Sequence, residues 1–131
     1  MIAFLIILGI ITPQSNNFAT ELFNQTNDSR VEHLKWDKCL SYQATKRAEE
    51  MVENNYFSHT DLNGKKPFKD MIESCVDYTH AGENLIKDFN NPSSAQQALM
   101  NSPMHRDNIL GDYEKLGVGC YKNICVEFFA K

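Results

Sequence analysis

The 131-residue sequence lacks the features that identify nucleic-acid-binding, membrane-spanning and zinc-finger proteins. It has no run of basic residues, and a net charge of −4 gives no electrostatic signature of nucleic acid. It has no apolar stretch of the roughly 20 residues that a transmembrane helix needs. None of its four cysteines stands in a Cys-x-x-Cys pair, which argues against a structural zinc site. With 42% hydrophobic and 23% charged residues, the composition is that of one ordinary soluble globular domain.

The N-terminus differs from the rest of the chain. The segment MIAFLIILGIITPQS contains about ten apolar residues, the length of a signal-peptide core. It has no basic residue after Met1 and no clear small-x-small cleavage motif, and processing is placed between Thr12 and Asn17. We therefore predict a signal peptide or N-terminal hydrophobic segment over 1–16, and one domain over 17–131 that is secreted, periplasmic or extracellular. An N-terminal helix or an uncleaved anchor is the alternative.

The cysteines form an even set, which is typical of an oxidising compartment. In CYKNIC, Cys120 and Cys125 stand on either side of a four-residue turn, and they face each other if the flanking strands pair. We predict a Cys120–Cys125 disulfide, which leaves Cys39 and Cys75 as the second pair. The alternative is four buried free thiols in a cytosolic protein.

Apolar periodicity predicts helices in the first three quarters of the chain and strands at its end. The expected helices cover 17–33, 37–55, 67–76 and 92–103, with a further helical turn over 103–110. Asp37 caps the second helix, and Pro67 begins the third. The tail 114–130 is expected to form two strands with a tight turn. This order predicts an α+β fold in which helices cover a mostly antiparallel sheet.

Three short polar segments carry the residues best suited to form a site: His59 in NYFSHTD, Glu83 in HAGENLI and His105 in SPMHRDNIL. Two neutral imidazoles and a carboxylate are good ligands for a divalent ion such as zinc. A carboxylate beside a histidine equally orients the ring and raises its basicity, which gives a general base. In the structural alternative, Glu83 accepts backbone hydrogen bonds and Asn84 stabilises a turn.

In order and spacing, FSHTDLNGKKPF, AGENL, NSPMHRDNIL and KLGVGCY resemble the motifs of the CAP superfamily, the SCP domains of cysteine-rich secretory, antigen 5 and pathogenesis-related proteins. The form SP-x-HR-x-NIL is similar to the compact bacterial branch, and the similarity covers nearly all of the chain after the leader. It implies a three-layer α-β-α sandwich with a cleft lined by two histidines and two glutamates. His59, Glu83 and His105 match three of them. The second glutamate falls at Ser102 and is missing, and Met104 stands where glycine is usual.

The resemblance leaves three functions open. The first is a secreted protein whose cleft binds a ligand or a divalent metal ion, such as zinc on His59 and His105, with no defined reaction. The implied partners are a small or lipid-like ligand, or an extracellular or envelope protein. The second is a metal-dependent hydrolase, a peptidase or nuclease, with the two histidines as ligands and Glu83 as base. The third is an extracellular protein-interaction domain. No serine or cysteine nucleophile is evident for covalent catalysis.

Two further polar residues flank these motifs. His80 is a lone histidine in a loop and is interpreted as solvated. Arg106 has the planar fork that binds anions, but it is expected to pair with Asp107, Asp112 or Glu114 at the surface.

Overall fold

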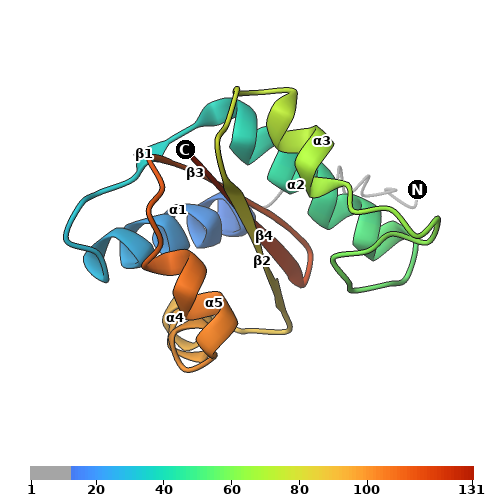
Figure 1. The fold of residues 1–131 in the computed structure, drawn as a ribbon. Coiled ribbons are helices and arrows are strands. Elements are labelled where there is room, and N and C mark those ends of the chain that lie inside the picture. Colours follow the sequence, from blue (N-terminus) through green and yellow to red (C-terminus); the bar gives the residue numbers. More distant parts are fainter. Residues whose placement is uncertain (1–12) are drawn as a thin grey trace, which may run out of the picture.

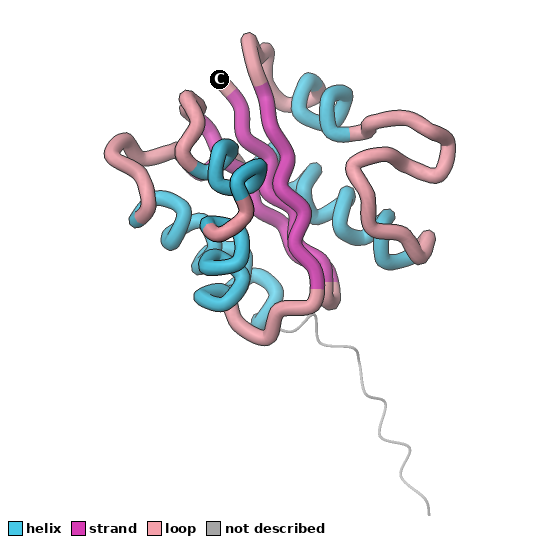
Figure 2. Tube along the Cα trace, turned by 60° about the horizontal axis from the view of Figure 1, so that its bottom comes forward, coloured by secondary structure: helices cyan, strands magenta, loops and turns pink. Residues whose placement is uncertain are grey.

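A single four-stranded sheet lies between two groups of helices (Figure 1). The computed structural model describes residues 13–131. Helices α1, α4 and α5 cover one face of the sheet, and α2 and α3 cover the other (Figure 2). The predicted three-layer α-β-α sandwich is therefore confirmed. The elements are α1 (Pro13–Asp28), β1 (Lys35–Trp36), α2 (Lys38–Glu53), α3 (Phe68–Glu73), β2 (Ala81–Lys87), α4 (Pro92–Met100), α5 (Pro103–Ile109), β3 (Lys115–Tyr121) and β4 (Ile124–Ala130).

The sheet has the order β1-β3-β4-β2 and is mixed. Strands β2 and β3 both run antiparallel to the central β4, as predicted for the closing hairpin. The two-residue strand β1 lies parallel to β3 at the edge, pairing Lys35 with Lys115 and Trp36 with Leu116. The sheet is therefore mostly antiparallel, as predicted, with one parallel pair of two residues.

Strand β2, like the two-residue β1, was not predicted from the sequence. Five of its seven residues are buried in an unbroken run, so it shows no alternation of buried and exposed positions. Both faces of the sheet are covered by helices, and a strand in that position loses the period-two pattern. Its buried run also includes the polar residues Glu83 and Asn84, which removes the apolar signal as well.

Helix α2 forms as predicted. The side chain of Asp37 caps it by accepting the Leu40 amide at 2.8 Å. The helix lies directly on β3, where a Cβ added to Gly117 would overlap the backbone of Leu40, so glycine is required for this approach. The apolar stripe of α2 is fully buried: Leu40, Ala44, Ala48 and Met51.

Helix α1 is shifted from the predicted range of 17–33. It covers Pro13–Asp28, so residues 13–16 of the predicted leader belong to it, and residues 1–12 lie outside the described part of the chain. The helix ends early because the side chain of Asn27 binds the backbone of Leu34, accepting its N–H at 2.8 Å and donating to its carbonyl at 3.1 Å. This pair of bonds turns the chain back, and His33 consequently lies in a loop.

Both predicted disulfides are present. Cys120 and Cys125 are directly opposite in the β3–β4 register, with Cα atoms 4.0 Å apart. Cys39 and Cys75 join the first turn of α2 to the segment after α3, with Cα atoms 5.6 Å apart. All four thiols are thereby used, and the alternative of free cysteines is wrong.

Candidate functional site

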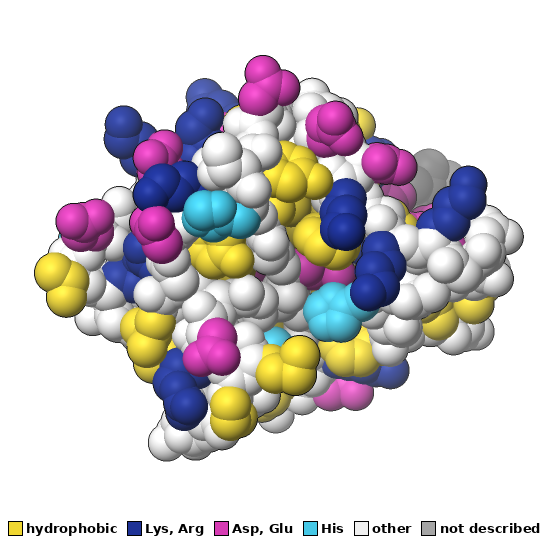
Figure 3. Space-filling model, in the orientation of Figure 1, with side chains coloured by type: hydrophobic (Ala, Val, Ile, Leu, Met, Phe, Trp, Pro, Cys, Tyr) yellow, Lys and Arg dark blue, Asp and Glu magenta, His cyan; other side chains and the backbone are white. Residues whose placement is uncertain are grey.

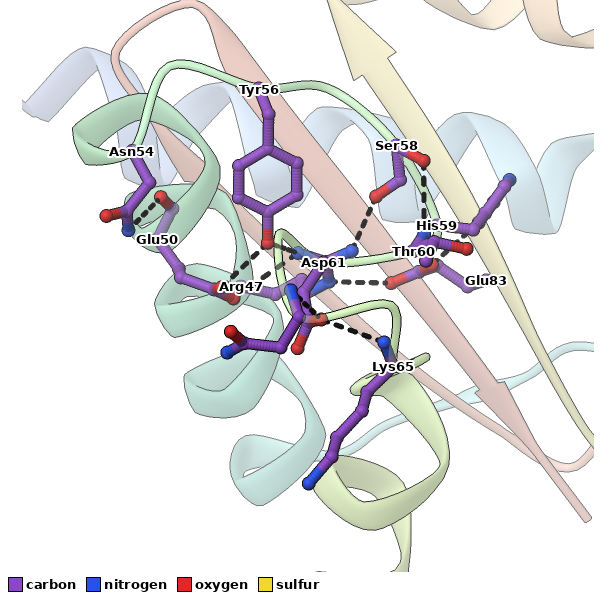
Figure 4. Close-up of polar contacts among 11 residues, drawn as sticks. Arg47, Glu50, Asn54, Tyr56, Ser58, His59, Thr60, Asp61, Lys65 and Glu83 are labelled. Carbon is purple, nitrogen blue, oxygen red and sulfur yellow. Dashed lines mark hydrogen bonds and ion pairs between the residues drawn. The ribbon is translucent and has the colours of Figure 1, made fainter.

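His59 and Glu83 are in direct contact. The Nδ1 atom of His59, in the loop between α2 and α3, lies 2.7 Å from Oε1 of Glu83 on β2 (Figure 4). The Glu83 side chain is 1% exposed, whereas that of His59 is 51% exposed. The imidazole therefore stands between a buried carboxylate and the solvent.

Arg47 lies on the other side of the same carboxylate. Its Nε is 3.4 Å from Oε2 of Glu83, and its side chain is fully buried. Its two terminal nitrogens donate to the hydroxyl of Tyr56 at 2.7 Å and to the carbonyl of Ser58 at 2.6 Å. Because Ser58 precedes His59, Arg47 holds both the acid and the loop that carries the imidazole.

The sequence analysis missed Arg47, although the sequence contains a signal for it. Arg47 follows Ala44 by three residues and precedes Met51 by four, which places a cation within the buried stripe of α2. A charged residue at such a position is buried and needs a partner.

Tyr56 and Glu50 extend the network away from the sheet. Tyr56 donates to Oε1 of Glu50 at 2.7 Å, and Oε2 of Glu50 lies 3.3 Å from Arg47. Burial, followed by the hydrogen bond to Glu50, raises the pKa of Tyr56 to about 12. The phenol thus stays protonated and donates throughout the physiological range. Figure 4 shows Arg47 between this pair and the Glu83–His59 pair.

Glu83 is subject to opposing electrostatic effects. Burial raises the pKa of its carboxyl group. The hydrogen bond from His59 and the positive charge of Arg47 act in the opposite direction. Oε1 is hydrogen-bonded to His59, whereas Oε2 is in the ion pair with Arg47 and has no hydrogen-bond partner among the described residues. No backbone amide of the described residues binds either oxygen, so the structural alternative, in which Glu83 accepts backbone hydrogen bonds, does not describe this side chain.

His105 lies on α5, where its Nδ1 is 2.7 Å from the hydroxyl of Ser102. Ser102 is the residue that stands in place of the missing second glutamate. Burial lowers the pKa of His105, and the charge of His59 lowers it further, so the two imidazoles are within electrostatic range of each other. Both effects favour a neutral His105 ring. Met104, beside it, is 82% exposed.

Two asparagines attach α5 to β2. Asn84 donates to the carbonyl of His105 at 3.2 Å. Asn108 donates to the carbonyl of Glu83 at 3.2 Å and to the side-chain oxygen of Asn84 at 2.8 Å. Asn84 therefore lies in a strand rather than in the expected turn, and it links the histidine of α5 to the strand of Glu83. We call His59, Glu83 and His105 the histidine site.

A second buried acid lies next to this attachment. Glu127 is opposite Asn84 in the β2–β4 register and is fully buried. Its Oε2 accepts the hydroxyl of Thr26 at 3.3 Å, while Oε1 has no hydrogen-bond partner among the described residues. Burial raises its pKa to about 7, against smaller opposing effects of Thr26 and Asn84. Local sequence patterns do not predict an acid in the middle of a strand that is buried along its whole length.

The flanking residues take no part in the histidine site. His80 is exposed, and its Nε2 lies 3.0 Å from the carbonyl of Asp112. Arg106 donates to the carbonyl of Met100 at 3.2 Å and forms no ion pair within residues 17–131. The expected pairing of Arg106 with a nearby acid is therefore wrong, and Asp112 pairs with Lys131 at 2.8 Å instead.

The described side chains do not form a complete set of metal ligands at the histidine site. In the part of the chain that the structure describes, no three His, Cys, Asp or Glu side chains form a group that could hold a metal ion. Glu83 is engaged by His59 and Arg47, and Nδ1 of His105 is engaged by Ser102, so the Nε2 atoms of the two rings are the ones that remain for other contacts.

Comparison with known proteins identifies the family. The chain matches the CAP family, described as the cysteine-rich secretory protein family, over residues 27–129. It belongs to this family, as its motifs indicated.

Two Bacillus subtilis proteins are similar in sequence. The membrane protein YlbC is 34% identical over 85% of the chain, and the protein YkwD is 37% identical over 66% of it. The chain spans only 34% of the length of each of them.

Solved structures share the fold. An extracellular SCP-domain protein of Bacillus anthracis has a TM-score of 0.81 and 29% identity, covering 94% of this chain and 45% of that one. An outer surface protein of Borrelia burgdorferi has a TM-score of 0.79 and 24% identity, covering 88% of this chain and 92% of that one.

No helix within residues 13–131 is long and apolar enough to cross a membrane.

Proposed function

We propose that this CAP-family protein acts outside the cytoplasm as a binding module, and that the histidine site recognises its ligand. Three observations support export: the apolar segment over 1–16, the two disulfides, and the extracellular or outer-surface relatives. Acidic and basic side chains are interspersed on the face seen in Figure 3, with no extended basic patch that would suit nucleic acid.

The observation that carries the ligand proposal is the 2.7 Å contact between His59 and Glu83. A carboxylate only accepts hydrogen bonds, so it fixes the proton of a neutral His59 on Nδ1. The Nε2 atom then carries a lone pair, on a ring that is half exposed. His59 thus presents a rigid hydrogen-bond acceptor to the solvent.

His105 would present a hydrogen-bond donor instead of an acceptor. When the Ser102 hydroxyl donates to Nδ1, the proton of the neutral ring lies on Nε2, which becomes a donor. One acceptor and one donor, on two imidazoles within electrostatic range of each other, would match a ligand group that both donates and accepts, such as a hydroxyl, a primary amide or a protonated carboxyl. We therefore propose a polar group of this kind as the part of the ligand that contacts the site.

The contacts favour recognition over the hydrolase alternative. A metal-dependent hydrolase requires side chains that ligate the metal and a carboxylate that is free to act as a base. The side chain of Glu83 is 1% exposed and is in contact with Arg47 and His59. The interaction-domain alternative makes a different prediction. A partner protein that binds elsewhere on the surface would keep its affinity when His59 and His105 are replaced.

Nitrogen-15 NMR of the imidazole rings tests this proposal. The probes are acetamide, glycerol and acetic acid, with zinc chloride added separately. We expect at least one organic probe to shift the Nε2 resonances of His59 and His105 together and saturably. His59→Gln should abolish the response at His105, and His80→Gln, which changes an exposed histidine elsewhere, should leave it intact.

Two results would overturn the proposal. In the first, no organic probe shifts either Nε2 resonance up to molar concentration. In the second, zinc binds both rings stoichiometrically and the organic probes do not bind, which would make the site a metal site after all.

A further inference from the structure

A groove lies along the outer edge of β3, remote from the histidine site in the fold. It has a volume of about 240 Å³ and is lined by residues of α1, β1, α2 and β3. Its walls include Ala19 of α1, Trp36 of β1, and Tyr42 and Thr45 of α2, and its floor is formed by Val118 and Cys120 of β3.

The groove exists because β1 is much shorter than β3. Strand β1 pairs only with Lys115 and Leu116, and among residues 13–131 no strand continues along the rest of this edge. The chain leaves the edge after Asp37, whose amide donates to the carbonyl of Leu116 at 3.0 Å. It then enters α2, which lies over one face of β3.

The backbone groups of this edge can be assigned from the pairing. The Leu116 carbonyl and the Val118 amide both point away from β4, since they bind Asp37 and the hydroxyl of Ser41 (3.1 Å). Because polar groups on one side of a strand recur every second residue, the carbonyl of Val118 and the amide and carbonyl of Cys120 also point outward. No strand of residues 13–131 pairs with these three groups.

We propose that this groove binds a short extended peptide segment, which adds as a strand to the free edge of β3. One residue of a strand parallel to β3 would donate to the Val118 carbonyl and accept from the Cys120 amide, extending the register that β1 begins. An apolar side chain of that segment would contact Trp36 or Tyr42, the two aromatic residues that line the groove, which are 38% and 59% exposed.

The backbone groups favour a peptide over a lipid chain. Val118 and Cys120 are only 2% and 8% exposed, so an occupant of the groove would complete the burial of the three outward groups. An alkyl chain would leave these groups without hydrogen bonds, whereas a peptide backbone would supply them. The volume is also below the roughly 300–1,000 Å³ that is usual for enclosed small-molecule pockets.

The flanking helices restrict the partner to a single strand. Residues of both α1 and α2 line the groove, and these two helices pack on opposite faces of the sheet. Helices α1 and α2 would collide before the β3 edges of two copies of the chain came within hydrogen-bonding distance. We therefore expect the partner to contribute an extended terminus or loop.

Selection from a library of random linear heptapeptides on the purified full chain tests the proposal. Selected peptides are expected to alternate apolar and polar residues. In hydrogen exchange followed by NMR, the Cys120 amide should exchange as an unpaired amide in the free protein and at least tenfold more slowly with saturating peptide. Every second peptide residue can be N-methylated in two ways, at the odd or at the even positions. One of these two peptides should not bind, because its methyl group replaces the N–H that donates to the Val118 carbonyl.

Matched variants localise the binding. Tyr42→Ala should weaken the selected peptides at least tenfold, as expected for an aromatic anchor. Leu62→Ala, which removes a side chain that is 69% exposed in a loop elsewhere, should leave the affinity unchanged.

Several outcomes would refute strand addition. One is a library that yields no binder above background, and another is a set of binders that leave Cys120 unprotected. A third is slow exchange of the Cys120 amide in the free protein, which would mean that the β3 edge is already covered. If dilution speeds up the exchange, a second copy of the chain covers the edge, and otherwise another part of the same chain does. These results leave the proposal for the histidine site untouched, because that site lies on other elements.

Discussion

Arg47 is the buried counterion of Glu83. The guanidinium on α2 and the carboxylate on β2 approach to 3.4 Å in a region where both side chains are excluded from solvent. The same guanidinium binds the carbonyl next to His59. The position of the exposed imidazole therefore depends on a buried ion pair between a helix and the sheet.

Replacing Arg47 by methionine is expected to destabilise the fold by about 3–5 kcal/mol, because it leaves a buried carboxylate without its counterion. Urea unfolding at pH 7 with the disulfides intact measures the change. The double variant Arg47→Met, Glu83→Gln should recover most of the loss. As a control, Lys46→Met removes the exposed Lys46–Glu49 pair and should change the stability by less than about 0.5 kcal/mol. A loss below about 1 kcal/mol for Arg47→Met would show that the ion pair is not what stabilises this region.

Glu127 is expected to make the stability depend on pH. Its pKa is about 7 in the folded protein and 4.5 in the reference state. The folded protein thus holds this proton more tightly, and the resulting stabilisation is complete below pH 4.5 and lost as the pH rises through 7. Between pH 4.5 and pH 8, the wild type should lose about 3 kcal/mol relative to Glu127→Gln. Urea unfolding of both proteins at several pH values measures the difference, and parallel pH curves would contradict the assignment.

The pKa of His105 tests whether the two imidazoles share one environment. Burial and the charge of His59 both lower it from 6.5. His59→Gln removes the second cause only, so the pKa of His105 should rise but stay below 6.5. Proton NMR of the ring resonances measures it. His80→Gln should have no effect, since His80 does not contribute to the shift. If His59→Gln leaves the pKa of His105 unchanged, the two rings act separately.

The two disulfides are expected to contribute unequally to stability. Cys39–Cys75 closes a sequence separation of 36 residues and Cys120–Cys125 one of only 5. From chain entropy alone, replacing both cysteines by alanine should cost about 4 kcal/mol for the first bridge and about 2 kcal/mol for the second. Thermal and urea unfolding of the two double variants give the comparison. An equal or reversed order would mean that native-state packing outweighs the entropy of the unfolded chain.

The features predicted correctly from the sequence are those with a local cause. The cap at Asp37, the apolar stripe that begins at Leu40, and the hairpin that pairs Cys120 with Cys125 each depend on residues a few positions apart. The predicted end of α1 was wrong because the Asn27 side chain binds Leu34 in a contact that periodicity does not encode. Strand β2 was missed because its burial comes from helices on both faces of the sheet, which no property of AGENLIK indicates.

By itself, the sequence determined the family, the α+β class and the Cys120–Cys125 pair, because each follows from short motifs or local spacing, and it left Cys39 and Cys75 as the second pair. Only the tertiary structure placed Arg47 next to Glu83 and left a strand edge without a partner strand between α1 and α2. These relationships join residues from separate elements, or depend on how far one strand extends past another. They arise from packing helices on both faces of one sheet, where a buried charge must find a partner and an unpaired backbone group must find an acceptor or donor.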